Sequence, residues 1–308
     1  MLAGKKILVT GATGTIARPI AEHLVHDNEV WCAGRFSDPN AKRQLEAQGV
    51  RTCFWDMGTG DFSAVPYDFT HVLHSALQIG PSLEEHDRAI TFNAEGAALL
   101  MQHCCRAEAF VHVSTFCVYK THSDHPRHLY SETDALGVDM TFSASYPVSK
   151  IAAEGAVRAA SRLLDLPTTI ARMNIGYSWT GGTGGLPVSY YKRMAAGDTI
   201  PLPIGHDDLC SPIGAQDIAV QSHALFEVAS TPATIVNWAG NDAVSTREMC
   251  EYIAGVAGLE PKFAPSEIRF DKRASDNARR NELIGKCSVH WKDGIPETLE
   301  RRLGIAIK

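Results

Sequence analysis

Residues 5–24 read KKILVTGATGTIARPIAEHL, an apolar run that meets a glycine-containing turn and then an amphipathic stretch. Gly11 permits a tight turn because a residue without Cβ adopts positive φ at little cost. Gly14 would let the backbone approach a pyrophosphate, and Ala17 would let the following helix pack closely against the strand. The N–H groups of residues 13–16 would face the anion with the positive end of the helix dipole. The pattern predicts a dinucleotide-phosphate site at the first strand-to-helix turn, with an unliganded glycine turn as the alternative.

Outward from this turn, short apolar runs alternate with amphipathic stretches through the first half of the chain. Near-continuous apolar strands between helices are typical of a parallel sheet that is covered on both faces. The pattern therefore predicts an α/β fold, a doubly wound parallel sheet of the Rossmann type with a smaller C-terminal substrate-binding lobe. Strands are predicted at 5–10, 29–34, 50–55, 70–75, 109–114 and 168–173, and helices near 15–27, 40–48, 83–106 and 146–164.

Beyond residue 174 the pattern is less regular. A Pro/Gly-rich stretch at 198–216 is expected to be irregular. Ser245 is placed to cap a helix, and Glu248 three residues later completes a capping box. Helices are predicted at 187–197, 215–229 and 245–258, and a strand at 234–240.

The composition excludes several broad classes of protein. With 308 residues, 44% hydrophobic and 21% charged, the chain has the balance of an ordinary globular protein. A net charge of −6 gives no reason to expect nucleic acid or an anionic membrane as a partner. No stretch approaches the ~20 apolar residues of a membrane span, and the chain enters a predicted strand at once, so a cytoplasmic location is expected. The eight cysteines form no CxxC pair and are expected to be reduced, with Cys104-Cys105 as a redox pair the alternative.

The end of the second predicted strand bears on which nicotinamide dinucleotide would bind. Sheets that bind NAD usually end this strand in an acidic residue that accepts from the ribose 2′-OH. Here Gly34 stands at that place, followed by Arg35 and Ser37. An arginine suits a 2′-phosphate, to which it can donate two charge-assisted hydrogen bonds, so NADP(H) is favoured over NAD(H). Arg35 as a plain surface charge is the alternative, and Asp38 could still reach a ribose. Asp56, after the third strand, is placed to accept from an adenine amino group or to cap the next turn.

A tyrosine and a lysine four residues apart open the predicted helix at 146–164, in the segment SASYPVSKIAAEGA. This spacing puts Tyr146 and Lys150 on one face of the helix. A tyrosine with its ordinary pKa near ~10 is a poor proton donor or acceptor at neutral pH. A neighbouring ammonium and an oxidised nicotinamide would stabilise the phenolate and lower that pKa. The pair is therefore the predicted proton-transfer pair, and a partly exposed Tyr beside a solvated Lys is the alternative.

Over nearly its full length the chain resembles the extended short-chain dehydrogenase/reductase family, which includes NAD(P)-dependent epimerases and dehydratases. The resemblance implies a homodimer formed through the helices near 83–106 and 146–164. It also implies interleaved lobes, with a dinucleotide-binding domain over 1–173 plus parts of 214–240 and a substrate-binding lobe mainly over 174–308. The motifs that carry the resemblance are the GxxGxxA turn at 11–17, Trp55-Asp56, HSA at 74–76, Asn93, HVSTFCVY at 112–119, YPVSK at 146–150, ARMNIGY at 171–177 and VNWAGNDAVSTREMCEYIA at 236–254.

The resemblance also assigns roles. Tyr146 would be the general acid/base, and Lys150 would hold the nicotinamide ribose and tune Tyr146. Thr115 takes the place of the family's hydroxyl that binds the reacting oxygen, with Ser114 the near alternative, and Asn93 would support the site from behind. The implied reaction is hydride transfer at the nicotinamide C4, coupled to proton transfer through Tyr146. The expected cofactor contacts are Gly11, Thr13, Gly14, Thr15, Ile16, Arg35, Ser37, Asp56, Met57, Ser75, Ala76, Asn93 and Lys150.

Departures from the family's patterns narrow the expected substrate. Phe116 and Cys117 stand where dehydratases carry Asp-Glu, so dehydration is not expected. Nucleotide-sugar members have an Asn at the place of Ile175, where Asn174 is displaced by one. Cys210 stands near the place of a diphosphate-binding Arg.

The acidic pair Asp207-Asp208 lies just upstream of that place and would repel a diphosphate, although Lys192 and Arg193 could substitute for the missing arginine. The main hypothesis is therefore an NAD(P)-dependent reductase or dehydrogenase acting on a small carbonyl or alcohol. The alternatives are an NAD-dependent nucleotide-sugar epimerase that retains its cofactor, and a non-catalytic dinucleotide-sensing partner protein. The residues expected to contact substrate, each of which could equally pack in the core, are Phe116, Met173, Asn174, Tyr177 and Trp179.

The segment THSDHPRH spaces His122, His125 and His128 three residues apart, with Asp124 between them. Histidines with a carboxylate can ligate zinc. Pro126 interrupts any helix that would align these side chains, and the family resembled here needs no metal. A solvated loop beside the active site, without a metal, is expected.

Overall fold

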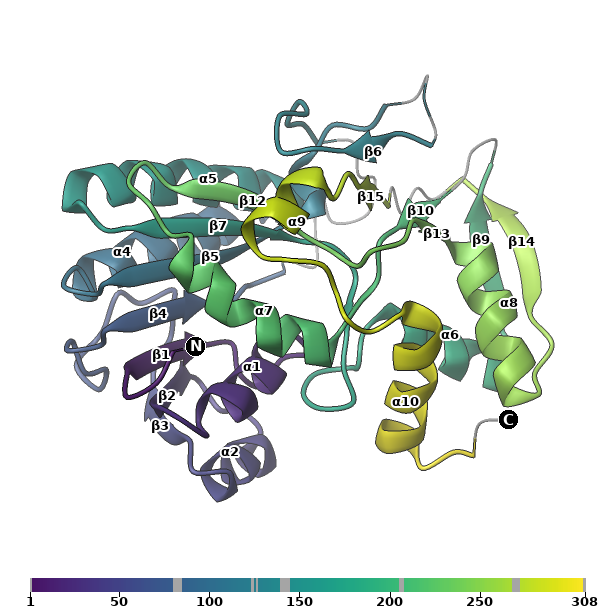
Figure 1. Ribbon diagram of the computed structural model, residues 1–308, viewed down its shortest axis with the longest axis horizontal. Coiled ribbons are helices and arrows are strands. Elements are labelled where there is room, and N and C mark those ends of the chain that lie inside the picture. Colours follow the sequence, from purple (N-terminus) through teal and green to yellow (C-terminus); the bar gives the residue numbers. More distant parts are fainter. Residues whose placement is uncertain are drawn as a thin grey trace.

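A seven-stranded parallel sheet forms the centre of the computed structural model, which describes residues 2–79, 85–122, 125, 127–138, 145–204, 208–267 and 272–306 (Figure 1). Its order is β12-β7-β5-β4-β1-β2-β3, and every neighbouring pair is parallel. The chain winds outward from β1 in both directions, which confirms the predicted doubly wound Rossmann fold. The strands are β1 (Lys6–Thr10), β2 (Glu29–Gly34), β3 (Arg51–Phe54), β4 (His71–His74), β5 (Ala109–Thr115), β7 (Thr168–Met173) and β12 (Thr234–Trp238).

Alternate residues of each strand enter two hydrophobic cores, one on each face of the sheet. In β1, Ile7 and Val9 belong to one core and Leu8 to the other, because successive side chains of a strand point to opposite faces. The first core is covered by α1 (Ala17–Leu24) and α7 (Ala215–Glu227), and the second by α4 (Gly96–His103) and α5 (Ser145–Leu164). The central strands are largely apolar because helices cover both faces, whereas the edge strand β3 is partly exposed.

The predicted helix before β5 is interrupted. It consists of α3 (His86–Ile90), a π-helical turn at Thr91–Glu95 and α4. The side-chain amide of Asn93, in this turn, donates to the Gln78 carbonyl at 2.8 Å and to Ser149 Oγ at 2.9 Å, and its Oδ1 accepts from Gln78 N at 2.8 Å. Single π-helical turns are frequent at functional sites. Here the turn joins the segment after β4 to the helix that carries the tyrosine–lysine pair.

A third hydrophobic core lies between α6 (Leu186–Ala195), α8 (Thr246–Ala257) and α10 (Trp291–Leu303). Beside it β9 (Thr199–Pro203) pairs in parallel with β14 (Lys262–Ser266), so part of the stretch predicted as irregular is a strand. A strand whose partner comes much later in the chain is not visible in local periodicity. The remaining short elements are α2 (Pro39–Ala47), η2 (Phe116–Val118), β6 (Leu129–Tyr130), β8 (Gly176–Tyr177), β10 (Leu209–Cys210), β11 (Ile213–Gly214), β13 (Val244–Ser245), β15 (Ala274–Ser275) and α9 (Ala278–Leu283).

Local signals in the second half agree with the structure where they are strong. The Ser245 hydroxyl accepts from the N–H of Glu248 at 3.1 Å, which confirms the predicted N-cap of α8.

None of the eight cysteines, all of which are described, forms a disulfide. Within the described ranges no helix has the length and apolar character needed to cross a membrane.

Candidate active site

The glycine turn after β1 forms the floor of a cavity of about 400 Å³ at the carboxyl ends of the central strands. Gly11 has φ +75°, and a Cβ there would lie 2.8 Å from the backbone nitrogen of Ala76. The N–H of Gly14 donates to the Gly11 carbonyl at 2.9 Å, which closes the turn. Only glycine fits this place without strain. The sequence-predicted residues that line the cavity are Gly11, Thr13, Gly14, Thr15, Ile16, Arg35, Asp56, Met57, Ser75 and Ala76.

The rim beside β2 is formed by Gly34 and the exposed Arg35. Asp38 does not line this cavity, and its carboxylate caps α2 by accepting from Asn40 N at 2.9 Å. Ser37 is exposed and does not line the cavity. Asp56 does line it, and its Oδ1 also accepts from Gly58 N at 3.1 Å. Asp56 thus both holds the turn after β3 and faces the cavity.

A second cavity of about 500 Å³ continues from the turn to the tyrosine of α5, with Thr15 and Ser75 at one end and Tyr146 at the other. Desolvation raises the pKa of the Tyr146 phenol and the nearby Cys117 thiol adds to the rise, while a hydrogen bond with Thr115 lowers it. Thr115 is therefore in contact with the tyrosine, as the family resemblance implies. In this state the phenol is protonated, and lowering its pKa requires additional positive charge.

Lys150 lies one turn further along α5 and is 2% exposed. Its ammonium donates to the Val113 carbonyl at 2.8 Å and lies 3.4 Å from His112 Nε2. Burial lowers the pKa of Lys150 to about 8, against an opposing contribution from Glu154. The side chain is therefore a buried cation at neutral pH, of the kind that stabilises a nearby phenolate.

Two of the predicted residues are hydrogen-bonded to the scaffold behind this site. The Ser114 hydroxyl donates to Glu154 Oε1 at 2.6 Å, and Glu154 is paired with Arg172 on β7 at 2.7 Å. Ser114 also lines the second cavity, but Thr115 is the hydroxyl that is hydrogen-bonded with Tyr146. Asn93 holds Ser149 and the backbone of Gln78 and does not line the cavities.

Two buried histidines were not singled out in the sequence. The His74 and His112 rings, on neighbouring strands β4 and β5, have centroids 5.4 Å apart. His74 Nδ1 is hydrogen-bonded to Thr10 Oγ1 at 2.8 Å, and burial lowers the pKa of His74 to about 3. Burial, with a further contribution from Lys150, holds the pKa of His112 well below its usual value. A neutral His112 accepts from Lys150 and fixes the direction of the ammonium. The signal in the sequence is one histidine near the end of each of two predicted strands, and the strand register places the two side by side.

A third cavity of about 310 Å³ opens beyond the tyrosine, between the ends of β5 and β7 and the helix α6. Phe116, Met173 and Asn174 line it, as expected for substrate contacts. Tyr177 does not: it is 1% exposed, within the third core, and a Cβ at Gly214 would lie 3.0 Å from its hydroxyl. Trp179 lies under the Arg301 guanidinium, 3.8 Å from the ring centroid, and likewise is not part of this wall.

The far wall of this third cavity is cationic. It contains Arg193, Lys272 and Arg273, with Asp208 as its only acidic residue among the described ones. Lys272 is paired with Asp208 at 2.7 Å, and its ammonium also donates to Tyr190 Oη at 2.7 Å. Burial alone would lower the pKa of Lys272, but Tyr190 and Asp208 hold it above the usual value.

The ion pair corrects one step of the sequence argument, in which Asp207-Asp208 repels a diphosphate. Asp208 is neutralised by Lys272, and Asp207 lies outside the described residues. Cys210 is buried, donates to the Val244 carbonyl at 3.5 Å and does not line the cavity. The cations come instead from α6, which carries Arg193, and from Lys272 and Arg273, which lie just before β15. The pairing of β15 with β6 brings Arg273 to the site. Asn174 holds that segment by donating to the Arg273 carbonyl at 2.7 Å.

The glycine-rich loop at 178–185 packs against the glycine turn after β1. Gly182 N donates to the Thr13 carbonyl at 2.8 Å, and Gly184 N to Thr15 Oγ1 at 3.4 Å. From α10, Arg302 donates to the carbonyls of Gly181, at 3.0 Å, and of Gly182. A charged side chain of the last helix thus holds this loop beside the turn.

The chain was compared with known proteins. Its residues 7–207 match the model of the NAD dependent epimerase/dehydratase family. No curated protein sequence matches it. A solved structure of UDP-glucuronic acid 4-epimerase from Bacillus cereus, with UDP-glucuronic acid and NAD, has a TM-score of 0.82 at 18% identity, covering 97% of this chain and 99% of that chain.

Two further solved structures are similar. UDP-N-acetylglucosamine 4-epimerase from Methanobrevibacter ruminantium M1 has a TM-score of 0.83 at 15% identity, covering 98% of this chain and 99% of that chain. UDP-glucose 4-epimerase from Thermotoga maritima has a TM-score of 0.79 at 18% identity, covering 97% and 99%. At these identities the likeness shows a shared fold, whereas the family model matches most of the chain directly. The chain therefore belongs to the NAD-dependent epimerase/dehydratase family.

Proposed function

We propose that the protein is an NAD-dependent epimerase that acts on a nucleotide sugar and keeps its dinucleotide bound. The observation that carries the proposal is the third cavity, which runs from Thr115 and Met173 to the cationic wall of Arg193 and Arg273. The Thr115 and Met173 part of this cavity is uncharged and the Arg193 and Arg273 part is cationic. A sugar fits the uncharged part and an anionic diphosphate fits the cationic part. This reading replaces the small uncharged carbonyl as the main hypothesis, because the acidic charge that argued against a diphosphate is paired with Lys272.

The residues around the tyrosine can carry out the proton transfers of such a reaction. A nicotinamide bound here would supply reversible hydride chemistry at its C4. Tyr146 accepts the proton of the sugar hydroxyl and later gives it back, and Thr115 orients that hydroxyl. In this proposal the buried ammonium of Lys150, one turn further along α5, and the positive charge of an oxidised nicotinamide together stabilise the phenolate form of Tyr146.

The dinucleotide would lie on the turn at Gly11 and Gly14, which the first cavity leaves open for it. The N–H groups at the start of α1 suit a pyrophosphate. The loop at 178–185, bound by Arg302, packs against this turn and would slow the exchange of the dinucleotide. Slow exchange of the dinucleotide is what this proposal expects, because an epimerase recycles its cofactor.

Replacing one cation of the wall tests the substrate class. Arg193→Gln is expected to raise KM for UDP-glucose or UDP-glucuronic acid roughly 10- to 100-fold with little change in kcat, because a charge-assisted contact to a phosphate contributes roughly 1.5–3 kcal/mol. The measurement is steady-state epimerisation followed by chromatography. Lys192→Gln is the matched control, because Lys192 is the exposed neighbour on α6 that does not line the cavity. Equal KM values in the two variants would contradict a diphosphate at this wall.

A second candidate function is an NADPH-dependent reductase, and the rim of the first cavity favours it. Gly34 occupies the place where an acidic residue would bind a ribose 2′-OH, and Asp38 is engaged as the cap of α2. Arg35 is exposed at this rim and suits a 2′-phosphate. The identity of the dinucleotide bound to the purified protein separates the two candidates.

A further inference from the structure

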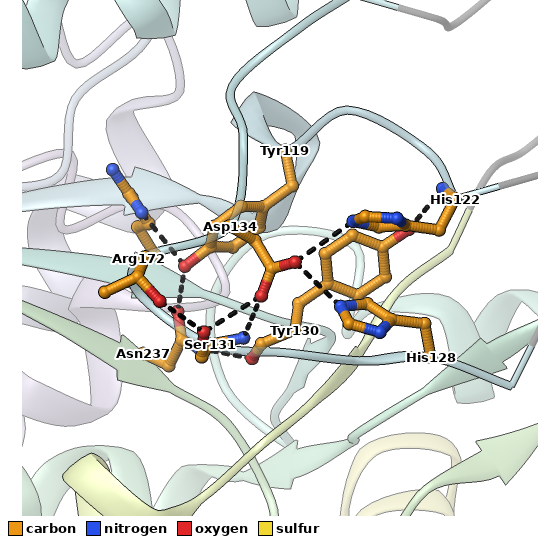
Figure 2. Close-up of polar contacts among 9 residues, drawn as sticks. Tyr119, His122, His128, Tyr130, Ser131, Asp134, Arg172 and Asn237 are labelled. Carbon is orange, nitrogen blue, oxygen red and sulfur yellow. Dashed lines mark hydrogen bonds and ion pairs between the residues drawn. The ribbon is translucent and has the colours of Figure 1, made fainter. Parts of the chain in front are cut away.

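Two histidines and an aspartate converge on the loop between η2 and β6, outside the proposed active site. His122 Nε2 lies 3.0 Å from Asp134 Oδ1, and His128 Nε2 lies 2.7 Å from the same oxygen (Figure 2). The two imidazole rings are adjacent, with centroids 4.2 Å apart. The three potential ligand atoms, one from each residue, all lie within 4.8 Å of one another. Two nitrogens and one carboxylate oxygen are thus directed at one point.

The carboxylate is held in place independently of the histidines. Asp134 Oδ2 accepts from the backbone N–H of Ser131 at 2.8 Å and from its hydroxyl at 2.9 Å. This leaves Oδ1 facing the two rings, as Figure 2 shows. A carboxylate whose second oxygen is already hydrogen-bonded is oriented as metal-ligating carboxylates are.

The histidines also rest on a rigid part of the fold. The Tyr130 ring lies 5.5 Å from the His122 ring and 4.7 Å from the His128 ring, and its hydroxyl accepts from the His122 N–H at 3.0 Å. Tyr130 is 4% exposed, and its carbonyl accepts from Asn237 of the central sheet at 2.8 Å (Figure 2). Support from the sheet holds the ligand atoms close to the positions that a bound ion requires.

We propose that His122, His128 and Asp134 form a binding site for one divalent transition-metal ion of the Zn²⁺ class. Zn–N and Zn–O distances of roughly 2.0–2.2 Å in a tetrahedron place ligand atoms about 3.3–3.5 Å apart. The observed separations of 3.0 and 2.7 Å from Oδ1 need to widen by only several tenths of an ångström. The ion replaces two N–H···O hydrogen bonds, and each imidazole carries its proton on Nδ1 when Nε2 binds the metal.

The fourth position is open to water. The side chains of His122 and His128 are 36% and 30% exposed, and that of Asp134 is 12% exposed. With one carboxylate and two neutral imidazoles, the protein ligands leave a net positive charge on the complex. The sequence argument against a metal relied on Pro126, which lies outside the described residues together with Asp124. The structure needs neither, since Asp134 supplies the carboxylate.

The site is linked to the substrate cavity. Thr121 precedes His122, and its hydroxyl lies 3.5 Å from an Arg273 nitrogen. Arg273 is part of the cationic wall of the third cavity. A metal ion would therefore fix the loop against which this arginine rests, and its role is structural.

The test is titration of the untagged, chelator-treated full-length protein with Zn²⁺ by calorimetry, and with Co²⁺ by visible absorption. The expected result is one ion per chain, the intense absorption of four-coordinate Co²⁺, and a rise in thermal midpoint with Zn²⁺. His122→Ala, His128→Ala and Asp134→Asn are each expected to weaken binding at least about 100-fold.

His125→Ala is the matched control, because His125 is exposed on the same loop but does not belong to the cluster. It is expected to bind Zn²⁺ as the parent does, with the same Co²⁺ spectrum. The proposal is overturned by an absence of binding to the parent, by binding that survives in His122→Ala/His128→Ala, or by an equal loss in His125→Ala. Circular dichroism of each variant establishes that the fold is intact, so a loss of binding reports on the ligands.

Discussion

Tyr146→Phe is expected to lower kcat by roughly 1,000-fold and to leave dinucleotide affinity almost unchanged. The phenol of Tyr146 lines the second cavity and is hydrogen-bonded with Thr115. Its hydroxyl is the group that we expect to take and return the substrate proton. The first cavity, where the dinucleotide would bind, does not include Tyr146. Steady-state turnover and fluorescence titration with the dinucleotide measure the two quantities separately.

Tyr191→Phe provides the matched control for this substitution. Tyr191 lies on α6, packs against the third core and lines none of the three cavities described above. It is expected to keep the parent's turnover. Full activity in Tyr146→Phe would remove the tyrosine from the proton transfer, and with it the mechanism shared by an epimerase and a reductase.

The largest effect on stability is expected at the buried ion pair behind the active site. Glu154→Gln should lower the free energy of unfolding by about 3–5 kcal/mol, because it leaves the Arg172 guanidinium buried without its counter-charge. Arg172 donates to both carboxylate oxygens of Glu154, at 2.9 and 2.7 Å, and both side chains are 3% exposed. Denaturant unfolding, with the slope compared between variant and parent, gives the difference.

A surface pair of the same chemistry gives the comparison for that value. Arg247 and Glu251 are 3.6 Å apart on α8, with side chains 53% and 55% exposed. Glu251→Gln is expected to change the free energy of unfolding by less than about 0.5 kcal/mol, because solvent screens an exposed pair. An equal, small loss of unfolding free energy in Glu154→Gln and Glu251→Gln would mean that burial of the Arg172–Glu154 pair has no energetic consequence. The account of this scaffold would then be wrong.

The parts of the fold that local sequence could predict are those with local causes. The turn at Gly11 was predictable because its positive φ and close backbone contact need glycine. Helical spacing predicted that Tyr146 and Lys150 lie one turn apart on one helix, and both are on α5, whereas their joint role in proton transfer stays a prediction. The Rossmann sheet followed from near-continuous apolar strands, and the N-cap at Ser245 from a short motif.

The substrate cavity was less predictable because its wall comes from distant segments. Lys272 and Arg273 reach it through the pairing of β15 with β6, and no local pattern indicates that pairing. Asp208 was therefore interpreted as a repelling charge, although Lys272 neutralises it. Tyr177 and Trp179 were expected at the wall from their residue type, but the first fills the third core and the second lies under Arg301.

The sequence singled out two members of the histidine cluster, His122 and His128, but not Asp134, for a related reason. Asp134 lies beyond β6, and only a chain reversal there brings its carboxylate to His122 and His128. The homodimer, the cytoplasmic location and the lobe boundary near residue 174 stay predictions, and the preference for NADP(H) belongs to the second candidate function. Oligomeric state, location and choice of cofactor depend on features that the packing of a single chain does not determine.

The most direct test of the proposed function is to identify the dinucleotide released by denaturing the freshly purified protein, and to record the nicotinamide absorbance when a UDP-sugar is added to the intact protein. The account predicts close to one NAD per chain that survives dialysis, a change in reduced nicotinamide on mixing, and epimerised sugar without net consumption of cofactor. A protein that arrives empty, binds NADPH reversibly and better than NADH, and shows no response to UDP-sugars would contradict it. That result would establish the Arg35-based reductase in its place.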